Sequence, residues 1–312
     1  MNASTGIYVR RWFWVIVSVV GILLGMGISQ VVQVHEATAE SHDDGLSELA
    51  AELEEIKARH RMLQAKWQSE LLAQIVPTLT DESNKVKREF VDFLEEIGSP
   101  GTPALVAMLR DPNRRVREEA VEALGEIGEI LAKNGQSTDT IRDALIASLN
   151  DSSRKVRTNA IGELSDIRAT STETFAALIG VLSDSSDSVR AAAEDALIEL
   201  GEGAAMTVAP MLSDALTNSQ SPVTRGHIVD VLGGIGEELV DDGKSGDMVV
   251  KPLLEALRDT AEDVRRNAAD ELGEMRATSP DVRDALTRLL DDSSKAVRDA
   301  AKKAIRRIEG GK

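Results

Sequence analysis

The side chains with the clearest chemical potential are four histidines, in a chain of 312 residues that contains no cysteine. His35, His42 and His60 come early in the chain, and His227 stands alone much further on. The sequence has no His-Glu-x-x-His zinc motif, no phosphate-binding glycine loop and no Gly-x-Ser-x-Gly nucleophile motif. The lack of cysteine excludes disulfides, thiol catalysis and cysteine-ligated metals. We therefore expect a chain without catalytic, cofactor-binding or metal-binding residues.

Carboxylates are plentiful, but they do not indicate an acid–base pair. Glu95 and Glu96 are adjacent in sequence, as are Glu118 and Glu119. Side chains at adjacent helix positions do not face each other. We interpret these pairs as solvated helix faces, and the lone His227 as a packing variant at a position that is otherwise small.

The most regular chemical pattern is an acidic residue followed six positions later by a basic one. Residues 151–164, DSSRKVRTNAIGEL, contain it in full: a turn-forming Asp-Ser start, then Val-Arg, then Ala and Leu. Self-similarity at a period of tens of residues indicates a solenoid. Weaker copies have Asp81 with Lys87 and Ser219 with Arg225, which makes seven units. The full copies have Asp111 with Arg117, Asp151 with Arg157, Asp184 with Arg190, Asp259 with Arg265, and Asp292 with Arg298.

Each copy has the composition of a turn that leads into a helix. Asp and Ser favour turns and helix caps because their side-chain oxygens accept hydrogen bonds from free backbone N–H groups. Apolar residues then recur at helical spacing, and a second apolar run precedes each turn. We predict an all-α solenoid over residues 77–310. Its helical hairpins are expected near residues 78–98, 102–128, 138–168, 171–201, 204–236, 247–276 and 279–309.

The last three units repeat the three before them at a constant offset, as in the segment RATS at 168–171 and again at 276–279. We infer that a three-unit block was duplicated in tandem, with one extra unit before it. The two longest connectors, at 129–139 and 238–247, fall at equivalent places. Equivalent insertions emerge on one edge of a solenoid, so they are either partner-binding protrusions or plain solvated loops.

The set of Asp, Val-Arg, Ala and Leu resembles HEAT repeats, especially the short repeats of phycobilisome-lyase-like proteins, over about residues 78–310. The resemblance implies a hydrogen-bonded ladder of aspartates and arginines across neighbouring repeats, with the pairs taken from the five full copies. Lys87 lacks the planar fork of arginine, so we expect the first unit to act as a cap. Some HEAT-like hydroxylases bind metals through His-Glu dipeptides, and the only one here, His35-Glu36, does not support that activity.

Residues 12–34 form an uncharged run of 23 residues, which is long enough to cross a bilayer. Two arginines precede the run and acidic residues follow it, so the positive-inside rule places residues 1–11 in the cytoplasm and the repeats outside it. A small-residue motif leaves open a signal peptide cleaved near Ala39, with a secreted or periplasmic product. We predict a single-pass membrane protein with a linker over residues 35–45.

Residues 46–76 have apolar residues at three- and four-residue spacing, which is typical of an amphipathic helix or a short coiled coil. Such a helix either pairs with a second copy or folds back on the first repeat. Glycines four positions apart in the membrane run also allow close helix approach. The possible dimer contacts are Gly21, Gly25, Leu49, Leu53, Ile56 and Leu63.

The net charge is −17, and all but −3 of it belongs to the chain after residue 77. An acidic surface repels phosphate backbones, which argues against nucleic acid as the main partner. Repeats without catalytic motifs favour a membrane-tethered protein-interaction scaffold that is not an enzyme. Its partner would be a protein with basic patches. Two alternatives remain: a HEAT-like tetrapyrrole (phycobilin) lyase subunit or accessory, and a homotypic assembly factor that dimerises through the anchor and the coiled coil.

Overall fold

The computed structural model describes residues 58, 59, 62, 63, 66, 70, 72, 75–79 and 83–310 of a chain that divides into two compact units, 1–71 and 72–312. The expected membrane run, and with it Gly21, Gly25, Leu49, Leu53 and Ile56, lies outside the described residues. Leu63 is helical and 52% exposed. Within the described part, no helix combines the length and apolar character needed to cross a bilayer.

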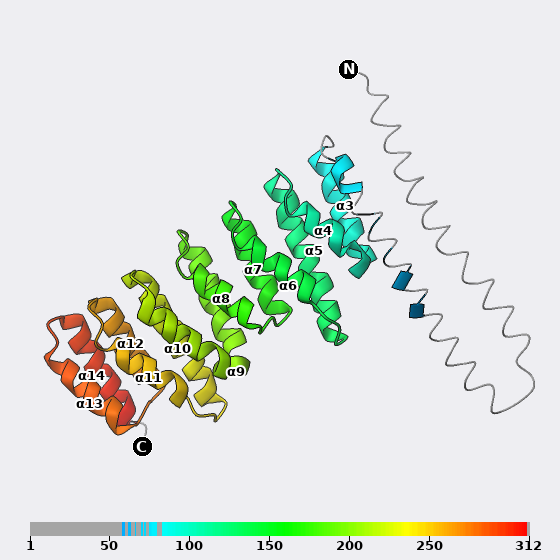
Figure 1. The fold of residues 1–312 in the computed structure, drawn as a ribbon. Coiled ribbons are helices and arrows are strands. Elements are labelled where there is room, and N and C mark those ends of the chain that lie inside the picture. Colours follow the sequence, from blue (N-terminus) through cyan, green and yellow to red (C-terminus); the bar gives the residue numbers. More distant parts are fainter. Residues whose placement is uncertain are drawn as a thin grey trace, which may run out of the picture. The chain divides into compact units, whose positions relative to one another are not determined.

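The second unit contains helices and no strands where it is described, and the helices form two rows (Figure 1). This arrangement confirms the predicted all-α solenoid. The first row has α4 (Thr102–Met108), α6 (Asp139–Ser148), α8 (Thr172–Val181), the later part of α9 (Asp187–Asn218), α11 (Asp247–Ala256) and α13 (Pro280–Arg288). The second row has α3 (Asn84–Ile97), α5 (Arg114–Lys133), α7 (Arg154–Asp166), the earlier part of α9, α10 (Pro222–Asp241), α12 (Glu262–Glu274) and α14 (Lys295–Gly310). Short 3-10 helices are η1 (Val76–Leu79), η2 (Ser99–Gly101) and η3 (Leu289–Asp291).

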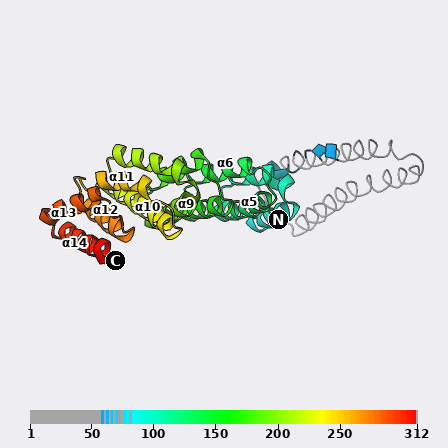
Figure 2. The ribbon, with the colours of Figure 1, turned by 90° about the horizontal axis from the view of Figure 1, so that it is seen from below.

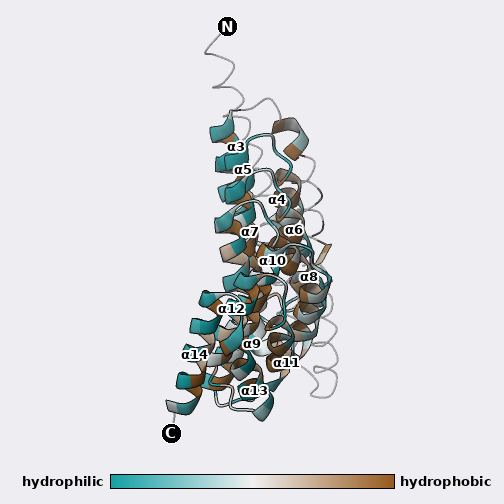
Figure 3. Cartoon of the chain, turned by 90° about the vertical axis from the view of Figure 1, so that its left-hand side faces the viewer, coloured by the Kyte–Doolittle hydropathy of each residue, from teal (hydrophilic) through white to brown (hydrophobic). Residues whose placement is uncertain are grey.

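Apolar residues at helical spacing hold the rows together. In α5, Val116, Ala120 and Leu124 are fully buried, and the other second-row helices follow the same pattern. Figure 2 shows the rows as two layers, with α6 and α11 in one and α5 and α10 in the other. Second-row helices pack against one another more closely than first-row helices do, which places the second row on the inner side of the array. The surface of the second row that faces away from the first row is largely hydrophilic (Figure 3).

Between the fourth and fifth units the chain stays within helix α9. The repeat spacing predicts a hairpin boundary between residues 201 and 204, but α9 is interrupted there only by Ala204, with φ −129° and ψ 22°. The local sequence, GEGAA, has no proline and no Asp-Ser pair to end the helix. The second helix of one unit therefore continues through a single bent residue into the first helix of the next.

The connectors predicted at 129–139 and 238–247 begin within helices, which continue to Lys133 and Asp241. Helices α5 and α10 each have 20 residues, against 13 in α7 and α12. The turns come afterwards, at Gly135 and Gly243, which have φ values of 66° and 73°. Positive φ favours glycine, and a glycine in this conformation commonly follows a helix. The extra residues thus lengthen two inner helices and do not form long loops.

Candidate functional site

Each rung of the aspartate–arginine ladder joins two neighbouring units. The guanidinium of Arg117 donates to both carboxylate oxygens of Asp151 in the next unit, each at 2.7 Å. Another of its nitrogens donates to the backbone carbonyl of Asp111 in its own unit at 2.9 Å. Asp151 Oδ1 also accepts from the backbone N–H of Ser153 at 2.7 Å, which closes the turn. One arginine therefore ties its own turn to the turn of the next unit.

The predicted pairs join each aspartate to the arginine of its own unit. For the carboxylates this prediction is wrong, because each rung joins two units. The arginine donates to the backbone carbonyl of the aspartate in its own unit. The carboxylate of that aspartate accepts from the basic residue of the preceding unit where a rung is formed. Among the described residues, Arg298 of α14 donates only to the carbonyls of Asp292 and Ser293. The remaining rungs are Lys87 with Asp111 at 2.8 Å, Arg157 with Asp184 at 2.8 Å, Arg225 with Asp259 at 2.7 Å, and Arg265 with Asp292 at 2.8 Å.

The ladder is interrupted between the fourth and fifth units, where Ser219 stands in place of an aspartate. Arg190 instead donates to Nε2 of His227 at 3.1 Å and to Asp187 in its own helix. Nδ1 of His227 lies against a carboxylate oxygen of Glu194. Burial and the charge of Arg190 lower the pKa of His227, which suits a neutral ring that accepts from arginine. His227, which the sequence suggests is a packing variant, replaces the missing carboxylate.

Titration of the rung aspartates reflects two opposed influences. Burial raises the pKa of Asp151, but the hydrogen bonds from Arg117 and Ser153 outweigh burial and hold that pKa below its usual value. The same balance lowers the pKa values of Asp184 and Asp259. A carboxyl whose pKa falls on folding stabilises the fold above its unfolded pKa, and this contribution is lost as the pH falls through the folded value. The ladder is therefore strongest at neutral pH.

Six carboxylates gather on the inner face of the first three units, where α3, α5 and α7 lie side by side. Among the described residues none of the six forms an ion pair, although Asn159 donates to Glu122 at 2.6 Å. Burial and a hydrogen bond with Glu126 raise the pKa of Glu95 to about 7. Burial and nearby carboxylates raise the pKa of Glu163 to about 7. This first acidic cluster consists of Asp92, Glu95, Glu122, Glu126, Glu163 and Asp166.

A second acidic cluster occupies the equivalent place on α10 and α12, but cations from α14 partly neutralise it. Lys303 lies 3.2 Å from Asp270, and Arg307 contacts Glu274. Burial, followed by the charges of Asp230 and Glu237, raises the pKa of Glu271 to about 8. The members are Asp230, Glu237, Asp270, Glu271 and Glu274.

Two equivalent glycines make room for the buried glutamates of these clusters. A Cβ at Gly125 would overlap the carboxylate of Glu163, and a Cβ at Gly233 would overlap that of Glu271. The two pairs are equivalent positions of the duplicated block, and the recurrence of glycine with glutamate is a signal in the sequence for the two buried glutamates. The interpretation of adjacent acids as solvated faces is wrong for Glu118, which is only 6% exposed.

The described residues contain no group of three or more His, Cys, Asp or Glu side chains that could hold a metal ion. His227 lies against Glu194 and accepts from Arg190, so these side chains belong to the interrupted rung. What the inner face offers is a row of carboxylates that can accept hydrogen bonds from cationic side chains.

Removing the charge of one rung should destabilise the array without changing its packing. Asp151→Asn keeps the size of the side chain but leaves the part-buried guanidinium of Arg117 without its counter-ion. We expect a loss of about 2–3 kcal/mol in the free energy of unfolding at pH 7, measured by urea titration. The difference from wild type should shrink as the pH falls below about 4 toward the lowered pKa of Asp151, at which the folded carboxylate takes up a proton. An equal loss at all pH values would mean that the charge is not what matters.

The buried Glu271 should make the fold less stable as the pH rises. Its folded pKa of about 8 exceeds the unfolded value of 4.5, so between these values the folded state holds a proton that the unfolded state has lost. Glu271→Gln mimics the protonated group and should be more stable than wild type by about 1–2 kcal/mol near pH 8.5, and almost equal to it near pH 5. Urea unfolding at both pH values measures this. Glu255→Gln on the exposed side of α11 is the control, and it should show no such crossover.

The HEAT-repeat family matches this chain over residues 70–134, 129–198 and 209–306. The TOG3 domain of Mini spindles from Drosophila melanogaster is similar at a TM-score of 0.50 and 19% identity, covering 67% of this chain and 94% of that one. An archaeal HEAT-like repeat protein from Thermococcus onnurineus NA1 has a TM-score of 0.43 at 16% identity, covering 78% of this chain and 97% of that one. Importin beta has a TM-score of 0.49 at 18% identity, covering 76% of this chain and 33% of that one.

The likeness to these structures shows the fold alone, and no curated protein sequence matches the chain significantly. The family match is to HEAT repeats in general and does not favour the tetrapyrrole lyases. It covers most of the chain beyond residue 70, including the units on either side of the interrupted rung. The chain belongs to the HEAT-repeat family.

Proposed function

We propose that this protein is an interaction scaffold without catalytic activity of its own, and that the inner face of its first three units binds a protein with a basic segment. The observation that carries the proposal is the first acidic cluster, in which six carboxylates on three neighbouring helices have no cationic partner among the described residues. HEAT-repeat folds are typical of protein-interaction modules, which agrees with this role.

The first acidic cluster is less stable on its own than in contact with cations. The pKa values of Glu95 and Glu163, both about 7, show that ionising these groups is unfavourable in the free protein. A lysine or arginine placed among the carboxylates would favour their charged forms. The second block has such cations within the chain, in Lys303 and Arg307. In the first three units no described cation forms an ion pair with the six carboxylates, so a partner would supply the pairing charge.

Membrane attachment belongs to the same proposal. The uncharged run at residues 12–34 would anchor the scaffold, with the repeats on the extracytoplasmic side. Residues 46–76 would either pair two copies or pack on the first repeat. Protease added outside spheroplasts or intact cells should cut the repeats if the orientation is right. Protection of the repeats under those conditions would overturn the orientation.

A basic peptide should bind to the first acidic cluster in a salt-dependent manner. We expect Glu122→Gln with Glu126→Gln to weaken binding of a fluorescent lysine-rich peptide about 5- to 30-fold, because each of the two lost contacts is worth about 0.5–1 kcal/mol. Fluorescence anisotropy measures the affinity, which should fall with added salt. The affinity for the peptide should rise between about pH 6 and pH 8, because Glu95 and Glu163 ionise in this range.

The matched control removes the same charge from the outer row, with Asp214→Asn and Asp284→Asn. Both side chains are exposed and lie on first-row helices, away from the cluster. This variant should keep wild-type affinity for the peptide. If it weakens binding as much as the cluster variant does, the peptide responds only to net charge, and the proposed site is wrong.

A further inference from the structure

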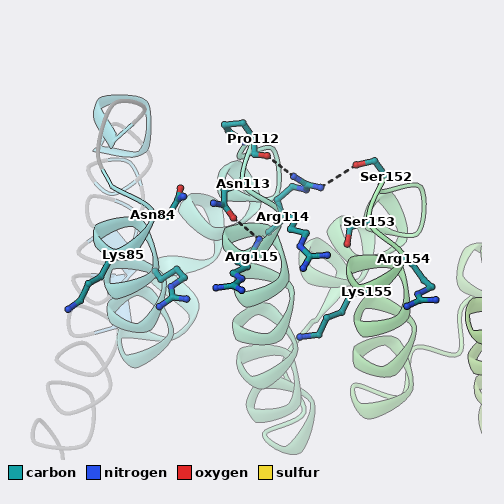
Figure 4. Close-up of a pocket in the computed structure, with 12 residues that line it drawn as sticks. Asn84, Lys85, Pro112, Asn113, Arg114, Arg115, Ser152, Ser153, Arg154 and Lys155 are labelled. Carbon is teal, nitrogen blue, oxygen red and sulfur yellow. Dashed lines mark hydrogen bonds between the residues drawn. The ribbon is translucent and has the colours of Figure 1, made fainter.

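A basic groove crosses the first turns of α3, α5 and α7, in a chain whose net charge is −17. The groove has a volume of about 1150 Å³, and no acidic side chain lines it. Figure 4 shows lysine and arginine side chains that extend from the starts of the three neighbouring helices. The basic residues of the groove are Lys85, Arg88, Arg114, Arg115, Arg154 and Lys155, besides the rung residue Arg117.

Half of these cations have no counter-ion. Arg114, Arg115 and Arg154 are exposed and form no ion pair with any residue that the structure describes. The others have only loose contacts: Arg88 lies 3.4 Å from Glu119, and Lys155 lies 3.6 Å from Glu118. Positive charge therefore remains uncompensated at the open side of the groove.

The position of these cations opposes the stability of their own helices. Arg114 and Arg115 lie in the first turn of α5, and Arg154 and Lys155 lie in the first turn of α7. The N-terminus of a helix carries partial positive charge from free N–H groups, so cations there are unfavourable and anions are favourable. The basic residues and the helix ends add to the same positive field, which suits an anionic ligand.

The duplicated block shows that the fold does not need these cations. When the two copies of the block are aligned, Arg114 and Arg115 correspond to Pro222 and Val223, and the pair Arg154 and Lys155 corresponds to Glu262 and Asp263. The helices that carry these counterparts, α10 and α12, form and pack as α5 and α7 do. The basic groove is therefore a property of the first three units alone.

We propose that the basic groove binds a short acidic peptide segment of a partner protein. Packed helices lie about 8–10 Å apart, so three of them span about 20 Å, which an extended segment of about six or seven residues would cross. Carboxylates of Asp and Glu match the fork of an arginine in two parallel hydrogen bonds. A long polyanion such as nucleic acid fits less well, because Glu118, Glu119 and Glu122 line the adjoining hollow and the neighbouring faces are acidic.

Charge reversal at two free arginines tests the proposal in the full-length protein held in mild detergent. Arg115→Glu with Arg154→Glu should weaken binding of a fluorescent peptide of alternating Glu and Asp, about seven residues long, by at least about tenfold in an anisotropy titration. The same variant should unfold at an equal or higher urea concentration than wild type, because acids suit a first helical turn. Loss of binding without loss of stability separates a ligand site from a structural role.

Control variants and probes make the outcome decisive. Lys251→Glu with Arg306→Glu changes the net charge equally at exposed sites in α11 and α14, and it should change the affinity less than twofold. Equal weakening by both variants would overturn the groove as the site, as would no binding by wild type. An oligothymidine of equal charge that binds more tightly than the peptide would overturn the peptide assignment. Because Glu122→Gln with Glu126→Gln leaves the groove intact, that variant should keep binding the acidic peptide even if the proposed basic partner proves wrong.

Discussion

A guanidinium that reaches across to the next turn keeps successive hairpins in register. Apolar contacts between helices are non-directional, so they favour stacking but do not by themselves choose one alignment. The two parallel hydrogen bonds from Arg117 to Asp151 have a fixed geometry and permit only one. The same aspartate also closes the turn through Ser153. Register between units and the shape of each turn thus depend on a single carboxylate.

Charge on the inner face of the first three units is arranged against the helix dipoles. Cations lie at the starts of α5 and α7, and carboxylates such as Glu163 and Asp166 lie near the end of α7. A sequence selected for stability alone would place acidic residues at the starts of helices and basic residues at their ends. Local rules of this kind are most often broken at functional surfaces. This arrangement agrees with the proposed binding of partners of opposite charge at the two surfaces.

Much of the fold could be predicted from the sequence because the repeat is itself a physical pattern. Seven copies of a turn and a helix determine a two-row array, and the aspartates and arginines of the ladder stand out by type and spacing. The direction of each rung could not be predicted, since six-residue spacing fits a contact within a unit or between units. The continuity of α9 through Ala204 was not predicted either, because the regular repeat spacing indicates a hairpin boundary there.

The charged surfaces could not be predicted from the sequence for a different reason. Glu95, Glu122 and Glu163 are far apart in the chain and ordinary in composition, and only stacking brings them together. The basic groove was masked by the strongly negative total charge, which describes the whole chain and not one edge of it. His227 has no repeated partner, so its place beside Arg190 follows only from the geometry of the interrupted rung.

The interrupted rung lies where the two copies of the duplicated block meet. Arg190 and Arg298 are equivalent positions in the two copies of the block, and neither meets an aspartate of a following unit. Among the described residues Arg298 donates to backbone carbonyls and not to a carboxylate, whereas Arg190 faces a unit that begins with Ser219. Each copy of the duplicated block therefore ends on an arginine that lacks a carboxylate partner in another unit among the described residues. Where the two copies meet, a histidine and a continuous helix take the place that a carboxylate rung has at the other boundaries between units.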